Sequence, residues 1–279
     1  MAKRFFLFFV YSNLFIAGCA VAMVDQTYRF LLQSPVNVYF LLFVLSSTLC
    51  SYSFHWYLTS HSVIPSPRLK WLEKNRNIHV VLFIIGLAGA GIFFFYLLPY
   101  WYWLLLGVFI TFLYSAPKLP YRYFRALRKV ALGKTIFLAF VWMYVTTILP
   151  IIISGKEWNT SYVLFTVSRF FQIYAICILF DYRDREDDKA NGIRSLITYL
   201  DEKGIFYLFT FSIIVFGTCT VLLYRYDYRI PDIIILLIPG ILTAALYQYA
   251  KRNFFDMFYY FFLDGLMAFS ALIMLISSI

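Results

Sequence analysis

The sequence predicts an all-α membrane protein, a polytopic bundle of nine transmembrane helices, from three observations. Of its 279 residues, 62% are apolar or aromatic and only 14% are charged, whereas an ordinary soluble domain carries roughly 25% charged residues. Aromatic residues alone make up 22% of the chain, and most of them lie in long apolar runs. At about 20 apolar residues per span, these runs leave room for nine helices and short loops. The composition therefore excludes a soluble enzyme and a disordered chain.

Nine apolar runs are long enough to cross a membrane. Lys3 and Arg4 followed by an apolar run also resemble a signal peptide, but the run continues past Cys19 and many spans follow, so we interpret it as the first span. The third and fourth runs meet at Pro99, and because proline ends a helix we count two spans there, with one long rod and eight spans as the alternative. The predicted spans are residues 5–24, 36–58, 78–98, 100–117, 133–153, 161–181, 205–224, 231–250 and 254–277.

The distribution of basic residues predicts the orientation of the bundle. If the N-terminus lies inside, nineteen of the 24 Lys and Arg residues fall on inner segments. Only Arg29, Lys156, Arg225 and Arg229 fall on outer segments, and Arg169 falls within a span. The positive-inside rule then places the N-terminus in the cytoplasm. The same bias explains the net charge of +10 without nucleic acid as a partner.

The rest of the chain offers little besides membrane helices. Cys19, Cys50, Cys177 and Cys219 all lie in apolar runs without metal-like spacing, so we interpret them as small buried side chains. We find no internal repeat, no low-complexity tract and no soluble domain at either end. The sequence therefore predicts one membrane domain over residues 1–279.

An acidic cluster follows the sixth span. Five of the fourteen acidic residues fall between Asp181 and Asp188. If the span continues as helix, Asp181, Asp184 and Asp188 lie within about 60° of one another on one face, whereas Glu186 and Asp187 point elsewhere. Three carboxylates on one face suit a hard divalent cation, and Mg²⁺ typically bridges carboxylates to phosphate oxygens.

A structural interpretation of this cluster stays open. The carboxylates could form a solvated cap on a membrane helix, with Arg183, Arg185 and Lys189 pairing locally. In either interpretation, the dipeptide Asn191-Gly192 predicts the end of that helix.

A second pattern, Tyr114-Ser-Ala-Pro-Lys118, ends the fourth span at the same membrane face. Pro117 ends the helix and places Lys118 in the layer of the acidic cluster. An ammonium group and a phenol are both donors to phosphate. Taken alone, the pattern is equally compatible with a lysine that snorkels at an interface.

Together the two patterns resemble the UbiA superfamily of intramembrane prenyltransferases. Asp184-x-x-x-Asp188 with the following Gly192-Ile-Arg194-Ser resembles that family's second aspartate motif, and Tyr114 to Lys118 resembles its YxxxK element. The resemblance extends over essentially the whole chain and implies nine helices, a cytoplasmic N-terminus, Mg²⁺ as cofactor and a prenyl diphosphate as substrate. The site residues it implies are Asp184, Asp188 and Lys118 as catalytic groups, Tyr114, Asp181, Arg185, Arg194 and His55 as substrate-binding groups, and Asp181, Asp184 and Asp188 as metal ligands.

The chain departs from the family in one respect. The family's first aspartate motif should follow the second helix, but no Asp or Glu occurs between Gln26 and Leu72. His55 and His61 lie in the corresponding stretch and could give hydrogen bonds to phosphate, although a histidine near a membrane interface is more often structural. The site should therefore hold Mg²⁺ with fewer carboxylates than its relatives use.

In the family mechanism an allylic diphosphate ionises and an acceptor captures the cation, while Mg²⁺ and basic groups neutralise the departing diphosphate. The resemblance thus implies transfer of a prenyl or related group to a small acceptor at the cytoplasmic face, with a reduced Mg²⁺ site. The alternative is a non-catalytic relative that binds a prenyl lipid or a partner membrane protein. A transporter is a third interpretation, but its acids would lie at mid-membrane rather than at one face.

Two charges lie deep within predicted spans and require partners. Arg169 should face the interior of the bundle, because a charge in lipid is unfavourable. Asp264 in the ninth span is its expected partner, with acceptor binding as the alternative role. Asn13 is also polar at membrane depth, and an interhelical hydrogen bond explains it.

Overall fold

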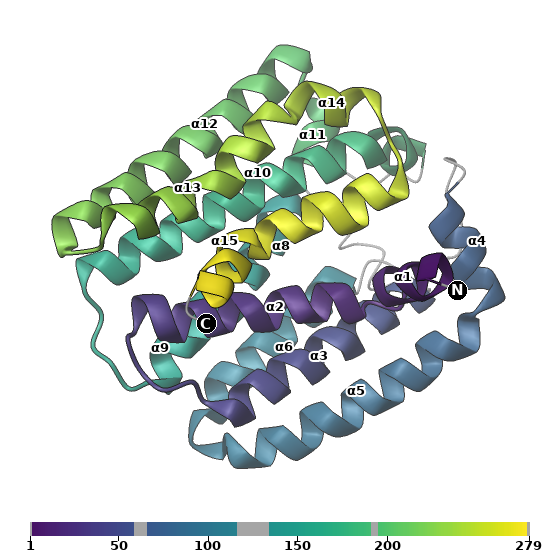
Figure 1. The fold of residues 1–279 in the computed structure, drawn as a ribbon. Helices are drawn as coiled ribbons and strands as arrows, with labels where there is room; N and C mark the ends of the chain where they lie inside the picture. Colours follow the sequence, from purple (N-terminus) through teal and green to yellow (C-terminus); the bar gives the residue numbers. More distant parts are fainter. Residues whose placement is uncertain (1, 59–65, 116–133, 191–194, 278–279) are drawn as a thin grey trace.

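The computed structural model describes residues 2–58, 66–115, 134–190 and 195–277. Within these ranges all regular structure is helical, and nine helices are long and apolar enough to cross a membrane. The predicted fold class and number of spans are therefore confirmed. The spans lie side by side along one common direction, from the end with the N-terminus, α4 and α11 to the end with α9 (Figure 1). We call the former the α4–α11 end.

The first five spans come from the following elements: α2 (Leu14–Gln26) with η1 (Thr27–Leu31), α3 (Val38–Tyr57), α5 (Arg76–Tyr96), η2 (Leu98–Tyr100) with α6 (Trp101–Ser115), and α8 (Lys134–Met143) with η5 (Tyr144–Ile148) and α9 (Leu149–Ile153). The last four come from α10 (Thr160–Ala190), α12 (Glu202–Leu222) with η6 (Leu223–Tyr226), α13 (Ile230–Ala245) with α14 (Tyr247–Arg252), and η7 (Phe258–Leu263) with α15 (Asp264–Ser277). The short helices α1 (Ala2–Tyr11), α4 (Pro67–Lys74) and α11 (Leu196–Tyr199) do not span.

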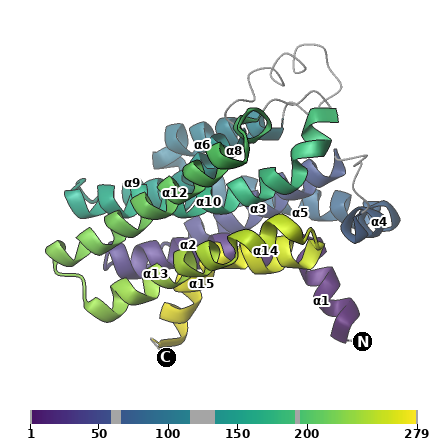
Figure 2. The ribbon, with the colours of Figure 1, turned by 90° about the horizontal axis from the view of Figure 1, so that it is seen from above.

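The first span begins nine residues later than predicted. Asn13 adopts a left-handed backbone conformation with φ 70°, which separates α1 from α2. Asparagine tolerates this conformation better than most residues. Its amide also donates to Ser53 Oγ at 3.4 Å, which provides the interhelical hydrogen bond expected of it. The membrane span is therefore Leu14–Leu31, and α1 leaves the bundle at an angle (Figure 2).

Apart from the end of the sixth span, the other predicted boundaries lie within four residues of those observed. The chain breaks at Leu97, before Pro99, so the third and fourth runs form two helices. The sixth span continues as one helix, α10, to Ala190, so the acidic cluster lies on a membrane helix as the spacing required.

Three segments of the spans have π-helical geometry, which occurs frequently at functional sites. They are η1, η5 and η7. The Thr27 hydroxyl of η1 donates to the Thr146 carbonyl of η5 at 2.6 Å, so two of these segments brace each other. The third, η7, directly precedes Asp264.

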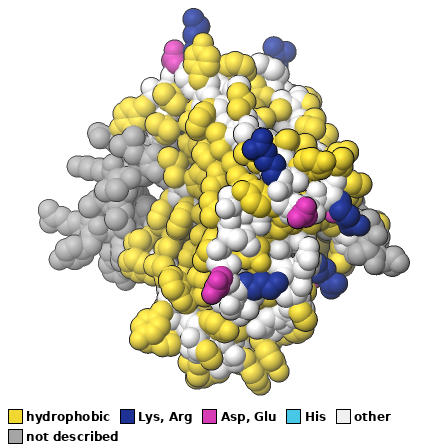
Figure 3. Space-filling view, turned by 90° about the vertical axis from the view of Figure 1, so that its left-hand side faces the viewer, with side chains coloured by type: hydrophobic (Ala, Val, Ile, Leu, Met, Phe, Trp, Pro, Cys, Tyr) yellow, Lys and Arg dark blue, Asp and Glu magenta, His cyan; other side chains and the backbone are white. Residues whose placement is uncertain are grey.

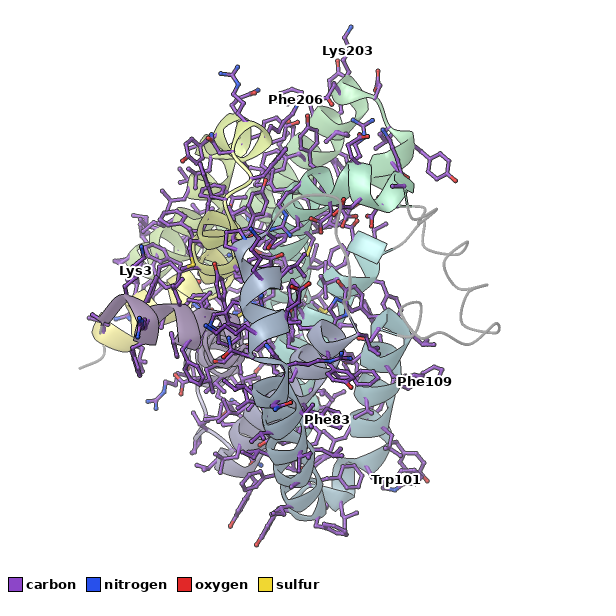
Figure 4. The ribbon with its side chains drawn as sticks, turned by 90° about the vertical axis from the view of Figure 1, so that its right-hand side faces the viewer. Lys3, Phe83, Trp101, Phe109, Lys203 and Phe206 are labelled. Atoms are coloured by element: carbon purple, nitrogen blue, oxygen red, sulfur yellow. The ribbon has the colours of Figure 1, made fainter. Side chains whose placement is uncertain are left out.

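The helices differ in how much of their surface they bury. α10 lies inside the bundle, with 67% of its apolar 18-residue stretch buried, whereas only 11% of the corresponding stretch of α5 is buried. On α6, Trp101 and Phe109 point away from the bundle (Figure 4). At the end of the bundle opposite to α4 and α11, hydrophobic side chains dominate the surface and charged ones are scattered among them (Figure 3). The outward aromatic side chains of α6, on the flank of the bundle, suit contact with lipid.

Arg169 and Asp264 do not form the expected ion pair. Arg169 donates to Gln26 Oε1 at 2.6 Å and to the Met23 carbonyl at 3.1 Å. Its charge thus points into the bundle, as expected because a charge that faces lipid tails is unfavourable. Asp264 instead lines a large cavity.

Candidate active site

A cavity of about 830 Å³ lies inside the bundle. At the α4–α11 end its wall includes Asp184 and Asp188 of α10, and toward the opposite end it includes Leu104 of α6 and Leu149 of α9. Phe83 of α5 also lines it. The cavity therefore joins a polar mouth to a long apolar chamber.

The carboxylates of α10 face this cavity. Asp181, Asp184 and Asp188 all contribute to its wall, as their spacing along one helix face predicted. Glu186 is exposed and pairs with Lys189 at 3.1 Å. The prediction that Asp187 points elsewhere is wrong, because Asp187 also lines the cavity. At 100° per residue Asp187 lies about 60° from Asp184, so a wide cavity reaches it too.

The carboxylates are held by different partners. Asp181 accepts a hydrogen bond from the Thr135 hydroxyl, and Asp184 pairs with the Nε atom of Arg183 at 2.8 Å. Asp188 is buried, with 5% of its surface exposed. Within the described ranges, no three His, Cys, Asp or Glu side chains converge on one metal position. Because Mg²⁺ is usually held by one or two carboxylates together with substrate phosphates, this donor set fits a Mg²⁺–phosphate complex better than a preformed metal cage.

Tyr114 and His55 also meet at the cavity wall. Their rings stack with centroids 5.2 Å apart and an interplanar angle of 16°. His55 Nδ1 lies 3.3 Å from Oγ of Ser115, so the end of α3 contacts the end of α6. The structure thus brings these two predicted residues together with the α10 carboxylates.

Of the other predicted site residues, Arg185 is not brought to the cavity, and two cannot be placed because they lie outside the described ranges. Lys118 and Arg194 lie outside the described residues. Arg185 bonds to Glu202 at 3.1 Å and to the Leu200 carbonyl at 2.8 Å, so it ties α10 to α11 and α12 and is not part of the cavity wall.

A buried arginine at the cavity mouth was not predicted. Arg68 of α4 is 3% exposed, and its guanidinium carbon lies 3.9 Å from the Trp56 ring centroid and 4.1 Å from that of Tyr260. It also donates to Asn13 Oδ1 at 2.8 Å. Asp256 fixes the start of α4 by accepting from the Arg68 backbone N–H at 2.7 Å.

Arg183 contacts the same tyrosine. Its Nη2 atom donates to the Tyr260 hydroxyl at 2.7 Å, so Tyr260 links the arginine of α10 to that of α4. Burial lowers the pKa of Arg68, and the neighbouring Tyr260 and Asp256 oppose that shift. Burial, together with the Asp256 carboxylate, raises the pKa of Tyr11 to about 12, so this phenol stays neutral beside them.

The sequence carried only a weak signal for this cluster. From the sequence, Arg68 is only one of many basic residues whose distribution predicts the orientation of the protein. Asp256 is an isolated acid at the start of the predicted last span. Only the folded chain shows that the two lie together.

The chamber below the mouth is lined mainly by apolar and aromatic side chains. Trp142 Nε1 donates to the Tyr52 hydroxyl at 3.1 Å, and both rings line the chamber. An apolar chamber of this volume accommodates a lipid chain, whereas the carboxylates at its mouth suit a polar headgroup with a cation.

Comparison with known proteins agrees with this geometry. Residues 58–263 match the UbiA prenyltransferase family. No curated protein and no solved structure matches the chain. The match covers the segment from the end of α3 to η7, which includes both predicted motifs, and the chain therefore belongs to the UbiA prenyltransferase family.

Proposed function

We propose that this protein transfers a prenyl group from a prenyl diphosphate to a small acceptor at the cytoplasmic face, using a reduced Mg²⁺ site. One observation carries the proposal: a single cavity joins the α10 carboxylates to a long apolar chamber. The headgroup of the donor occupies the mouth, and its chain occupies the chamber. Family membership supports a transferase of this type.

The headgroup is bound by residues at the mouth. Asp184 and Asp188 would hold Mg²⁺ at the mouth, and Asp181 completes the acidic face of α10 that lines the cavity. When bound, the ion neutralises the charge that develops on the departing diphosphate. Tyr114 and His55 donate hydrogen bonds to the diphosphate from the facing wall. Lys118 and Arg194 are the further phosphate donors in this proposal.

The chamber shelters the allylic cation. Tyr52 and Trp142 present aromatic faces to it, and a cation over such a face gains about 2 kcal/mol when water is excluded. The apolar wall also keeps water away from the cation, so that the acceptor captures it.

The whole chain forms this unit with its N-terminus in the cytoplasm. The family match leaves residues 1–57 and 264–279 outside. These segments pack on each other, since Gln26 Nε2 donates to Ser270 Oγ at 3.1 Å. The basic residues gather on the segments at the α4–α11 end, which supports placing that end inside.

A labelled allylic diphosphate tests the proposal. The purified full chain in detergent is incubated with it and Mg²⁺, and the release of diphosphate is followed. We expect release by the wild type, loss of release in the Asp184→Asn/Asp188→Asn double variant and little change in the exposed control Glu186→Gln.

The same assay separates the second candidate function. A non-catalytic relative that binds a prenyl lipid is favoured by the lack of any Asp or Glu between Gln26 and Leu72. Binding of the diphosphate without its release identifies that function and excludes the transferase.

A further inference from the structure

Asp264 is a second acidic feature of the cavity, separate from the α10 cluster. It is the first residue of α15 and lines the same cavity as Tyr52 and Met267. It lies six residues after the start of its span at Phe258, which places it about 9 Å along the helix at about 1.5 Å per residue. Asp264 therefore belongs to the membrane-embedded part of the chamber and not to the end of the long α10.

No protein group in the described part of the chain neutralises Asp264 by direct contact. Among the described residues no hydrogen bond and no ion pair reaches its carboxylate, and Arg169 is engaged by Gln26 and Met23. Arg68 and Arg183 act on Asp264 electrostatically, but their guanidinium groups bond to Asn13, Asp184 and Tyr260. An intramembrane carboxylate that faces a cavity in this way marks a functional site.

Two features surround Asp264 in the chamber, a π-helical segment and a tyrosine hydroxyl. The π-helical segment η7 directly precedes it, and such segments occur frequently at functional sites. Tyr52 lies within electrostatic range of Asp264, and its oxygen accepts from Trp142, which leaves the phenolic proton available as a donor. The chamber thus offers one carboxylate acceptor and one hydroxyl donor to a polar group that lies among apolar side chains.

We propose that Asp264 binds the acceptor substrate and takes its proton, and that this acceptor presents a neutral hydroxyl or amine rather than a carboxylate or phosphate. This inference rests on the proposed prenyl transfer and names the acceptor class for it. The acceptor O–H or N–H donates to the Asp264 carboxylate, while its apolar body packs in the chamber.

The transfer step balances with the groups present. The bond between the allylic carbon and the diphosphate oxygen breaks, and the diphosphate leaves with the electron pair. A lone pair of the acceptor oxygen or nitrogen forms the new bond to that carbon. The O–H or N–H bond then breaks, its electrons stay on the acceptor, and the proton goes to Asp264.

Charge sets the selectivity for the acceptor. A carboxylate or phosphate next to Asp264 would place two like charges together in a low-dielectric chamber, which is strongly unfavourable. Arg68 and Arg183 already act on the Asp264 carboxylate and hold hydrogen bonds to Asn13, Asp184 and Tyr260, so a second anion beside Asp264 would have to share their charge with carboxylates already present.

Chemical labelling tests the proposal without depending on turnover. Dicyclohexylcarbodiimide modifies carboxyl groups that are reached from an apolar environment. The purified full chain is labelled in the presence of a prenyl thiolodiphosphate and one of four probes, namely 4-methylphenol, 4-methylbenzyl alcohol, 4-methylaniline and 4-methylbenzoate. We expect modification of Asp264, protection by the hydroxyl and amine probes and no protection by the benzoate.

Substitution gives the second readout. We expect Asp264→Asn to bind the thiolodiphosphate like the wild type but to transfer a labelled prenyl group to the protecting probe about 10²–10⁴-fold more slowly, the usual contribution of a general base. Asp264→Glu restores part of the rate. The matched control Asp25→Asn, which removes a carboxylate paired with Arg29 outside the cavity, leaves it unchanged.

The outcomes separate the two proposals. If Asp264 is not modified, if the neutral probes give no protection, if the benzoate protects equally well or if Asp264→Asn transfers at the wild-type rate, the acceptor role is overturned while donor binding stands. If the wild type does not bind the thiolodiphosphate at all, the proposed function fails, and this inference fails with it.

Discussion

The guanidinium carbon of Arg68 lies 3.9 Å from the ring centroid of Trp56. This contact fastens α4, which follows the second span, onto the end of α3. The Tyr260 ring at 4.1 Å extends the stack to η7, so one arginine joins three parts of the bundle at the cavity mouth. The segment that lacks the family's first aspartate motif is followed by a buried cation.

Replacing Arg68 by glutamine should destabilise the protein. The change removes the cation from two aromatic faces and takes a donor from Asn13, with an expected loss of about 2–4 kcal/mol. Thermal unfolding in detergent measures it. Arg76→Gln is the control, because Arg76 is exposed and its guanidinium carbon lies 4.4 Å from a single described ring centroid, that of Tyr57. Equal unfolding temperatures for both variants would contradict this role of Arg68.

Gly86 allows α3 and α5 to approach closely. A Cβ atom there would lie 2.7 Å from the backbone N of Cys50 and 2.8 Å from the carbonyl of Ser46, so Gly86→Ala must push the two backbones apart. We expect a loss of about 1–3 kcal/mol from this overpacking.

A second glycine of α5 provides the control for that change. Nothing lies within 4 Å of a Cβ added at Gly91, so Gly91→Ala should raise the stability by up to about 1 kcal/mol through helix propensity. Unfolding temperatures of the two variants that shift in the same direction would contradict the close approach.

Gln26 satisfies the buried charge of Arg169. Gln26→Leu leaves that guanidinium with only the Met23 carbonyl and also removes the hydrogen bond to Ser270. Leaving a buried donor unsatisfied costs about 1–3 kcal/mol. Thermal unfolding should show this loss for Gln26→Leu and not for Gln248→Leu, an exposed glutamine of α14. A stable Gln26→Leu variant would mean that Arg169 finds another acceptor.

The carboxylates of α10 should differ in their effect on Mg²⁺-dependent binding. We expect Asp184→Asn and Asp188→Asn each to abolish it and Glu186→Gln to leave it intact, because Glu186 is exposed and paired with Lys189. Asp187→Asn should have an intermediate effect, since Asp187 also lines the cavity. Isothermal titration with a non-hydrolysable prenyl diphosphate, with and without Mg²⁺, measures this. Unchanged binding by the Asp184/Asp188 double variant would remove the metal site.

The sequence predicted most of the fold because membrane spans are defined by length and hydrophobicity, both of which are local. The first span is the exception. Its apolar run is longer than one span, and hydropathy alone cannot show that Asn13 leaves the helical conformation and divides it. That break depends on partners far along the chain, Ser53 and Arg68.

The site was only partly predictable for a related reason. Helical periodicity correctly placed Asp181, Asp184 and Asp188 on one wall, because all three belong to one helix. The width of the cavity, and with it the role of Asp187, depends on neighbouring helices. The partner of Arg169 could not be predicted either. It is Gln26, an uncharged residue, whereas the sequence predicts a charged partner.

The length of α10 has a consequence for ion binding in a bilayer. Its 31 residues extend about 46 Å at about 1.5 Å per residue, whereas the hydrocarbon layer is about 30 Å thick. The carboxylates at the end of the helix therefore lie among lipid headgroups, where anionic lipids create a negative surface potential. That potential concentrates divalent cations at the membrane surface, so Mg²⁺ should saturate the protein at lower bulk concentration in anionic vesicles than in a neutral detergent.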